Sequence, residues 1–254
     1  YQYVNRAGSE QGRQRLATWL KTSASANMII SRQNAVKELK SMAGWRQDLQ
    51  AYGAGSAVRL STEESIRRWI SEENQFMGKP FWNIARFIAP VCAMSLLAFY
   101  LLDKIDLPAF LYILAPFMIV AFFTSRLVSP AYQALNRVSP ALETLAMSIG
   151  CVENASFRDP LLVSLQDRCR RGGDRASVRI HRLRKILDRF DYRMNPLVYI
   201  PLNIFLLWDL QVVLQLEGWK SENRQDSGAW FDVLAEMEAL SSIGTLSFNH
   251  PNWC

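Results

Sequence analysis

A dense run of cationic side chains between residues 168 and 189 is the strongest candidate for binding chemistry in this sequence. Guanidinium groups donate several hydrogen bonds in a fixed fork, so clustered arginines suit phosphate or carboxylate ligands. Ile180, Leu183, Leu187 and Phe190 form an apolar stripe along the same run. The pattern predicts a helix with one packed face and one cationic ridge. The candidate anion contacts are Arg168, Arg170, Arg171, Arg175, Arg179, Arg182, Lys185 and Arg189, with Arg184 in the same run.

Three interpretations of this ridge are open. The arginines form ion pairs with acidic helices of the same chain, contact anionic lipid headgroups, or contact nucleic-acid phosphates. A net charge of +6 and a pI of about 9.3 suit either external anion. Few aromatic residues are interleaved with the arginines, which argues against single strands stacking on this surface.

The sequence predicts no catalytic, cofactor-binding or metal-binding residues. The phosphate-binding pattern G-x-x-x-x-G-K-[S/T] is absent, and Gly172 and Gly173 are followed by Asp174. The two histidines lie far from any cysteine pair, and the four cysteines lack C-x-x-C spacing, which argues against zinc. We expect reduced thiols and therefore cytoplasmic exposure of the soluble part. A solvated helix face, rather than general acid–base chemistry, is expected for Glu63, Glu64, Glu72 and Glu73.

Helical periodicity extends over nearly the whole chain, and no alternating strand pattern of useful length occurs. The sequence therefore predicts an all-α fold. The expected helices cover residues 10–21, 28–42, 175–192, 197–216 and 230–243. Capping residues predict further helix starts at Ser61 with Glu64, at Ser139-Pro140 and at Asp159-Pro160. The expected buried faces are Leu16, Trp19 and Leu20 in the first helix, and Ile29, Val36 and Leu39 in the second.

Two uncharged apolar runs, residues 87–102 and 107–125, are joined only by the four residues DKID. As helices they would be about 24 and 28 Å long, close to the hydrocarbon core of a bilayer at about 30 Å. We interpret them as a transmembrane hairpin; the alternative is a hairpin buried in a soluble core. The residues expected to contact lipid include Phe87, Leu97, Phe99, Leu102, Leu107, Phe110, Phe117 and Phe122.

The charges around the hairpin predict its orientation. Lys79 and Arg86 precede the two runs, and Arg126 and Arg137 follow them. Because positive residues accumulate on the cytoplasmic side, both outer ends are expected to face the cytoplasm. The predicted location is membrane-associated and facing the cytoplasm, with a cytoplasmic protein as the alternative.

A third apolar run, residues 197–216, contains Asn203 and Asp209. An aspartate at the centre of a bilayer costs about 2.5–3.5 kcal/mol on insertion scales. We therefore expect a central core helix of a soluble bundle here, and treat a third span as the alternative.

The two ends of the chain resemble the core, or lever, domain of MutS-type mismatch-repair ATPases. The motif residues at the start are Asn5, Ser9, Gly12, Leu16, Trp19 and Leu20, followed by Ile29, Arg32, Val36 and Leu39. Those near the end are Glu236, Glu238, Ser241, Ser242 and Pro251. The middle of the chain is similar to a MutS-related group that carries membrane segments.

This resemblance implies an elongated, multi-helix lever domain with an inserted apolar hairpin. It also implies a nucleotide-binding domain beyond residue 254 that holds ATP and Mg²⁺ and forms a homodimer. We accordingly expect the chain to be a piece of a longer protein. The hairpin occupies the place of the family's DNA clamp, and Ser23-Ala24 replaces the family's Pro-Leu, so the resemblance does not extend to clamp-type DNA binding.

The expected organisation has three parts: residues 1–80 and 129–254 form the helical core, and residues 81–128 form the hairpin. The expected function is to couple the nucleotide domain to a membrane or to DNA, in a setting such as DNA mismatch repair, without enzyme activity in this chain. The alternative is a soluble, basic DNA-binding or scaffold module with its hairpin buried.

Overall fold

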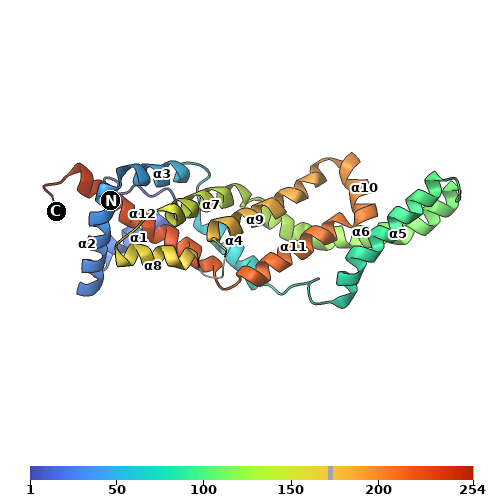
Figure 1. Ribbon diagram of the computed structural model, residues 1–254, viewed down its shortest axis with the longest axis horizontal. Coiled ribbons are helices and arrows are strands. Elements are labelled where there is room, and N and C mark those ends of the chain that lie inside the picture. Colours follow the sequence, from blue (N-terminus) through green and yellow to red (C-terminus); the bar gives the residue numbers. More distant parts are fainter. Residues whose placement is uncertain (171–173, 254) are drawn as a thin grey trace. The chain divides into compact units, whose positions relative to one another are not determined.

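The computed structural model describes the backbone of residues 1–170 and 174–253, and the side chains of all of these except 130–134. Throughout this part of the chain the regular structure is helical, with no strand (Figure 1). The predicted all-α fold is therefore confirmed.

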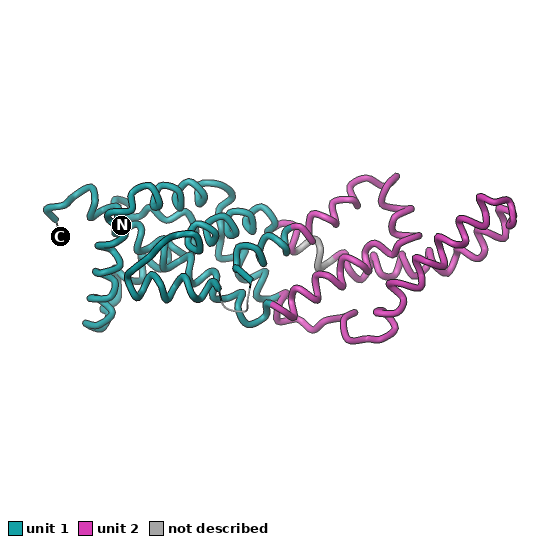
Figure 2. The backbone as a smooth tube through the Cα atoms, viewed as in Figure 1, with its two compact units in different colours: residues 1–68, 138–184, 223–254 teal, residues 69–137, 185–222 magenta. Residues whose placement is uncertain are grey.

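Two compact units divide the chain (Figure 2). Unit 1 comprises residues 1–68, 138–184 and 223–254, and unit 2 comprises residues 69–137 and 185–222. Unit 1 contains α1 (Glu10–Lys21), α2 (Ala26–Ser41), α3 (Ala43–Gly53), α7 (Ser139–Asn154), α8 (Pro160–Cys169), α12 (Ser227–Asn249) and most of α4 (Leu60–Ser71) and α9 (Ala176–Asp188). Unit 2 contains α5 (Pro80–Leu101), α6 (Leu107–Asn136), the 3-10 helix η1 (Arg189–Met194), α10 (Pro196–Leu206) and α11 (Trp208–Asn223).

The core of unit 1 is the C-terminal helix α12, which is buried on nearly all of its faces. Its aromatic side chains Trp230 and Phe231 are each only 2% exposed. Helices α1, α2, α3, α7 and α8 all pack against it. Both α1 and α2 contribute a fully buried leucine, Leu16 and Leu39, as predicted. Burial of these apolar side chains is the main favourable term for this unit.

The predicted buried faces of α1 and α2 are wrong at one position each. Leu20 is 58% exposed and Ile29 is 44% exposed. Burial in α1 lies toward its start, at Gln11, Gly12 and Leu16, so the end of the helix is left uncovered. Helical periodicity gives the direction of a face, but it does not say how far along the helix a neighbour extends.

The start of α8 confirms the prediction at Asp159-Pro160. The Asp159 side chain accepts hydrogen bonds from the backbone N–H groups of Leu161 and Leu162, at 2.9 and 3.3 Å. The carboxylate of Glu38, on α2, accepts the N–H of Arg158 at 2.8 Å and that of Asp159 at 2.6 Å. Two carboxylates thus satisfy the free donors of one helix start.

The predicted capping box at Ser61 is wrong. Helix α4 begins at Leu60, so Ser61 lies inside its first turn. The Leu60 N–H instead donates to the carboxylate of Glu10 at 2.9 Å. A side chain distant in sequence therefore replaces the local cap. Ser139 is the first residue of α7 and Val138 precedes it as the cap, so that prediction is displaced by one position.

In unit 2 the buried carboxylate of Glu217 fixes the chain before α5. It accepts hydrogen bonds from three consecutive backbone N–H groups, those of Gln75, Phe76 and Met77. Consecutive N–H groups that converge on one anion form a concave backbone site of the kind that binds phosphates elsewhere. Here the protein's own side chain occupies it.

The third apolar run is two helices, which corrects the prediction of one helix over residues 197–216. Helices α10 and α11 meet at an angle of 77°. The break is Leu207, whose φ of 47° and ψ of 50° place it in the left-handed region. A left-handed leucine costs about 1–2 kcal/mol, and burial of its side chain to 1% exposure offsets this. The core-helix prediction holds for α11, most of which is buried, but not for α10, in which Asn203 is the one buried residue.

Candidate membrane hairpin and the polar cluster beside it

Helices α5 and α6 form the predicted apolar hairpin and are long and apolar enough to cross a membrane. They are longer than the uncharged runs, with 22 and 30 residues. Within their apolar windows only 11% of α5 and 22% of α6 is buried by the rest of the chain. The alternative prediction of a hairpin covered by protein therefore finds no support among the described residues.

The turn of the hairpin confirms that DKID joins two antiparallel helices. Asp103 adopts a left-handed φ of 51° after the end of α5. The N–H of Lys104 donates to the carbonyl of Phe99 at 3.0 Å, which closes the helix with a Schellman-type cap. Asp106 then precedes α6, with Pro108 in its first turn.

Most of the residues predicted to contact lipid are exposed. Phe87, Phe99, Leu102, Leu107 and Phe122 are exposed, Leu97 and Phe117 are half-buried, and Phe110 is buried. Phe110 instead packs against Leu96 and Leu114 within the hairpin, and its ring stacks on Tyr100 at 4.7 Å. The two helices therefore share a narrow apolar core and expose the rest of their apolar surface.

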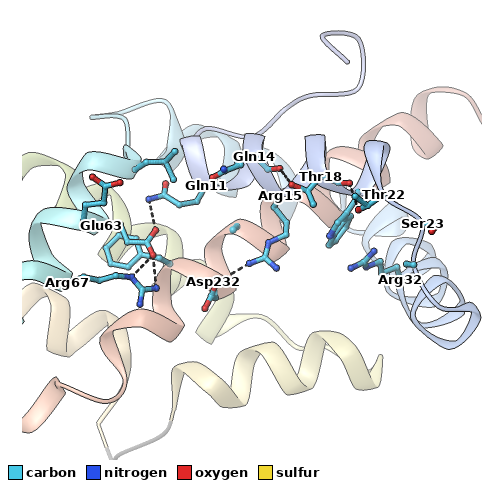
Figure 3. Close-up of a pocket in the computed structure, with 16 residues that line it drawn as sticks. Gln11, Gln14, Arg15, Thr18, Thr22, Ser23, Arg32, Glu63, Arg67 and Asp232 are labelled. Atoms are coloured by element: carbon cyan, nitrogen blue, oxygen red, sulfur yellow. Dashed lines mark hydrogen bonds and ion pairs between the residues drawn. The ribbon is translucent and has the colours of Figure 1, made fainter. Parts of the chain in front are cut away.

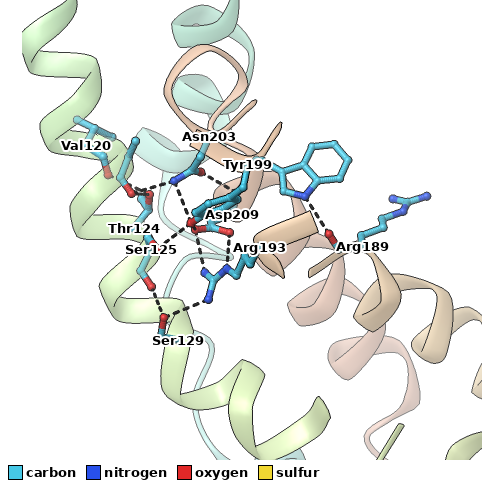
Figure 4. A network of polar contacts seen from close by, with 11 residues as sticks. Val120, Thr124, Ser125, Ser129, Arg189, Arg193, Tyr199, Asn203 and Asp209 are labelled. Carbon is cyan, nitrogen blue, oxygen red and sulfur yellow. Dashed lines mark hydrogen bonds and ion pairs between the residues drawn. The ribbon is translucent and has the colours of Figure 1, made fainter. Parts of the chain in front are cut away.

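A buried polar cluster lies beside the hairpin in unit 2, and we call it the Asp209 cluster (Figure 4). Its members are Ser125 and Ser129 on α6, Arg193 on η1, Tyr199 and Asn203 on α10, and Asp209 on α11. The carboxylate of Asp209 is fully buried. Arg193 faces it, with Nε donating to Oδ1 at 3.0 Å and Nη2 lying 2.8 Å from Oδ2. A buried carboxylate needs a partner of this kind to remain charged.

The remaining members connect this ion pair to α6. The hydroxyl of Tyr199 donates to Asp209 and lies 2.8 Å from the hydroxyl of Ser125. Nη1 of Arg193 donates to the hydroxyl of Ser129 at 3.1 Å. The cluster thus holds four elements of unit 2 together.

Asn203 links the cluster to the break between α10 and α11. Its side-chain oxygen accepts the N–H of Asp209 at 3.1 Å, and its amide group donates to the carbonyl of Ala121 at 3.3 Å. The first bond satisfies a donor that the broken helix leaves free. The sequence predicted Asn203 and Asp209 only as obstacles to a membrane span; the partner Arg193 was missed.

The cations of residues 168–189 do not all face solvent: several of them pair with acidic side chains of the same chain. The predicted cationic ridge is therefore shorter than expected. Arg179 is wrongly predicted to be exposed, since it is 8% exposed and pairs with Asp226 at 2.7 Å. Arg184 pairs with Glu143 at 2.7 Å. Arg168 lies 3.8 Å from Asp232. These pairs match the interpretation in which the arginines contact acidic residues of the same chain. The apolar stripe opposite them is buried, as predicted.

Other cations of the run contact neutral groups. Arg170 donates to the carbonyl of Glu153, Arg175 to the side chain of Asn154, and Arg189 to the side chain of Gln215. Arg182 and Lys185 are exposed on α9. Arg171 lies outside the described residues.

The motif residues from the two ends of the chain meet in unit 1. Ser9 caps α1 by accepting the N–H of Gly12 at 2.9 Å, and its own N–H and hydroxyl donate to Glu238 on α12. Gly12 permits this contact, because a Cβ there would lie 2.2 Å from the Glu238 carboxylate. Ser242, one turn further along α12, accepts the N–H of Arg6 at 3.1 Å.

Glu238 predicts a specific pH dependence. Burial raises its pKa above the ordinary value of 4.5, and hydrogen bonds from Ser9 and Gly8 oppose that effect. Because the pKa is higher in the folded state, its contribution to stability is largest at acid pH and is lost as pH rises through the folded-state pKa. We expect the stability of the unaltered chain to fall relative to Glu238→Gln between pH 4.5 and neutral pH. Denaturant unfolding of both proteins across this interval checks the prediction, and parallel curves would contradict it.

A cleft of about 590 Å³ lies along α1 in unit 1 (Figure 3). Two ion pairs line it: Arg15 with Asp232 at 3.0 Å, and Arg67 with Glu63 at 2.6 Å. Glu63 was predicted to be solvated, and its side chain is 17% exposed. The mixed signs of these charges give the cleft no preference for an anion.

Trp19 and Arg32, both residues of the motif, meet in the same cleft. The guanidinium group of Arg32 lies 3.8 Å above the centre of the Trp19 ring. Burial lowers the pKa of Arg32 from its ordinary value. The contact is a cation–π interaction that joins α1 to α2.

The two cysteines that the structure describes in unit 1, Cys151 and Cys169, offer little reactivity. Burial raises the pKa of the Cys169 thiol to about 12 and that of Cys151 to about 11. Since the thiolate is the nucleophile, both are inert at neutral pH. Among the described residues, no group of three or more Cys, His, Asp or Glu side chains is arranged to hold a metal ion.

Comparison with known proteins gives no relative: no family model, curated protein or solved structure matches this chain. The similarity to MutS-type ATPases therefore stays a prediction from the motif residues.

Proposed function

We propose that this chain is a helical lever anchored in a membrane by the α5–α6 hairpin. In this function the hairpin fixes one part of the chain in the bilayer. The bundle around α12 transmits the state of a nucleotide-binding domain that follows it in a longer, MutS-like protein. The chain itself binds no nucleotide, and the protein dimerises through the following domain.

The exposed surface of the hairpin is the observation that carries the proposal. The large apolar side chains exposed on it are Phe81, Ile84, Phe87, Ile88, Val91, Met94, Phe99, Leu101, Leu102, Leu107, Leu111, Tyr112, Ile113, Met118, Ile119, Phe122, Phe123 and Leu127. Fully burying one such side chain is worth about 1.5–3 kcal/mol. Leaving so many in water is unfavourable, whereas hydrocarbon accommodates all of them.

The contact between α1 and α12 supports the lever. Ser9 and Gly12 belong to the first motif and Glu238 to the last, and the three meet in a buried contact. A movement applied to the end of α12 would therefore reach α1 through Glu238. This is the physical basis for assigning both motifs to one mechanical element.

Membrane fractionation with matched lysine variants tests the anchor. We expect the unaltered chain in the membrane pellet, extracted by detergent and not by alkaline carbonate. Met94→Lys with Ile119→Lys places one charge near the middle of each helix, at a cost of about 2.5–3.5 kcal/mol each. We expect this double variant to leave the membrane fraction.

Val178→Lys is the matched control, because Val178 is also an exposed apolar residue, at 55%, but lies on α9 in unit 1. It should fractionate like the unaltered chain. A soluble, monodisperse chain without detergent would contradict the anchor. If that chain also bound duplex DNA with strong salt dependence, the soluble DNA-binding alternative would be favoured.

Phosphate release tests the assignment of nucleotide chemistry to the following domain. Purified chain mixed with ATP and Mg²⁺ is expected to release no phosphate above the background of an unrelated protein. Nucleotide-dependent release that follows the chain through purification would contradict this part of the proposal.

A further inference from the structure

Helix α10 directs polar side chains into the protein and exposes apolar ones, which is the reverse of a helix at a water surface. Its polar side chains, Tyr199 and Asn203, lie one turn apart and point into the Asp209 cluster. Three of its apolar side chains, Leu197, Val198 and Ile200, are 88%, 44% and 53% exposed. Toward the end of the helix, Ile204 and Phe205 pack against the apolar core of the hairpin. A helix that packs against a soluble core normally shows the reverse arrangement. Polar residues inside and apolar residues outside are typical of helices in lipid.

The contacts of α10 place it at the charged end of the hairpin. Tyr199 meets Ser125, the last residue of the uncharged run in α6, and Arg126 follows directly. Asn203 reaches the carbonyl of Ala121, one turn further into that run. The helix also packs against α5. Its exposed apolar residues therefore continue the exposed apolar surface of the hairpin.

The length of α10 excludes a span. Its 11 residues cover about 16 Å, whereas the hydrocarbon core is about 30 Å thick. Together α10 and α11 are long and apolar enough for a broken span, but α11 turns away by 77° and is mostly buried by the chain itself. It also carries the buried Asp209, Glu217 and Lys220, so α10 is the part that can meet lipid. By its length, α10 can thus enter no more than about one leaflet.

We propose that α10 is an interfacial membrane helix that buries Leu197, Val198 and Ile200 among the lipid acyl chains at the charged end of the hairpin, without crossing the bilayer. This inference rests on the proposed membrane anchor. Interfacial helices bury their apolar face about 5–10 Å below the headgroup boundary. Such helices usually turn a polar face toward water. In α10 the polar side chains Tyr199 and Asn203 instead make their hydrogen bonds within the protein, in the Asp209 cluster. The occupant of the apolar face is lipid, because that face adjoins the hairpin.

Fluorescence quenching at single cysteines tests the depth of α10. Cys92 and Cys254 are replaced by serine, whereas Cys169 is buried and Cys151 half-buried with raised thiol pKa values, so both stay in place. An environment-sensitive dye is attached at Leu197→Cys or Ile200→Cys. The chain is then reconstituted in phosphatidylcholine vesicles containing either shallow or deep nitroxide-labelled lipids.

Two further sites calibrate the measurement. Ile119→Cys lies near the middle of α6 and reports deep lipid, and the exposed Glu72→Cys reports water through quenching by iodide. We expect dyes at positions 197 and 200 to be quenched several-fold more by shallow than by deep nitroxides, and little by iodide.

The outcomes separate the two proposals. Iodide quenching at positions 197 and 200 together with lipid quenching at 119 overturns the interfacial helix and leaves the membrane anchor intact. Deep quenching at all three positions also overturns it, since α10 would then enter the bilayer centre. Iodide quenching at all three positions overturns the anchor and the inference together. Leu197→Lys, added to the labelled Ile200→Cys chain and to the labelled Ile119→Cys chain, gives a second readout. It should weaken shallow quenching at position 200 and leave the deep quenching at 119 unchanged.

Discussion

Asp209→Ala is expected to destabilise unit 2 by about 3–5 kcal/mol, the typical cost of leaving one partner of a buried ion pair alone. The side chain of Arg193 is only 12% exposed, and the variant removes the carboxylate that neutralises it. Tyr199 loses an acceptor as well, although the hydroxyl of Ser125 remains within reach. The effect should appear as a large loss in thermal stability in detergent micelles, followed by circular dichroism.

Two matched variants identify the cause of this loss. Asp209→Asn preserves the volume and one acceptor but removes the charge, so its cost should be intermediate. Arg193→Met combined with Asp209→Leu replaces both charges by apolar groups of similar volume, and such pairs are often neutral or stabilising. The double variant is thus expected to recover most of the lost stability. A double variant as unstable as Asp209→Ala would show that packing, rather than an unpaired charge, causes the effect.

Gly8→Ala is the second substitution with a large expected effect. A Cβ at Gly8 would lie 2.7 Å from the Cα and 2.8 Å from the carbonyl oxygen of Gly53, at the end of α3. Both are backbone atoms, so the clash cannot be relieved by rotating a side chain. At Gly12 the nearest obstruction is a carboxylate oxygen of Glu238, followed by Cβ of Glu238 at 2.9 Å and Cβ of Ala7 at 3.0 Å, so no backbone atom is met first. Overpacking of this kind costs about 1–3 kcal/mol.

Gly44→Ala is the control for this substitution. Gly44 lies on α3, the helix that ends at Gly53, but a Cβ at Gly44 meets no atom within 4 Å. Replacing such a glycine typically stabilises a protein by about 0.4–1 kcal/mol. The two alanine variants should therefore change stability in opposite directions when their denaturant unfolding is compared. Equal effects would mean that the contact between Gly8 and Gly53 is not tight in solution.

The sequence predicted those features that repeat along the chain. Helical periodicity and the length of the uncharged runs were enough to predict α1, the hairpin and the turn at DKID. Each of these is determined by residues close together in sequence. The capping prediction succeeded at Asp159, which contacts the N–H groups of its own helix. It failed at Ser61, where Glu10 supplies the cap from another helix.

The Asp209 cluster could not be predicted from local patterns. Asn203 and Asp209 were visible as polar residues in an apolar run, but their partners Arg193 and Ser125 come from other elements. The left-handed residue between α10 and α11 is Leu207, whereas glycine or asparagine usually marks such a position. The break is imposed by tertiary contacts and leaves little trace in the sequence.

The charged turn of the hairpin has a consequence for how the chain would reach its final place. Asp103, Lys104 and Asp106 lie at the tip, so the proposed topology requires all three to pass through the hydrocarbon core. At about 2.5–3.5 kcal/mol for each charge at the centre, passage is slow without assistance in either direction. Once the tip has reached the far side, the cost of moving its charges back through the hydrocarbon core would slow extraction of the hairpin. The hairpin would therefore stay in the bilayer when the lever pulls on it.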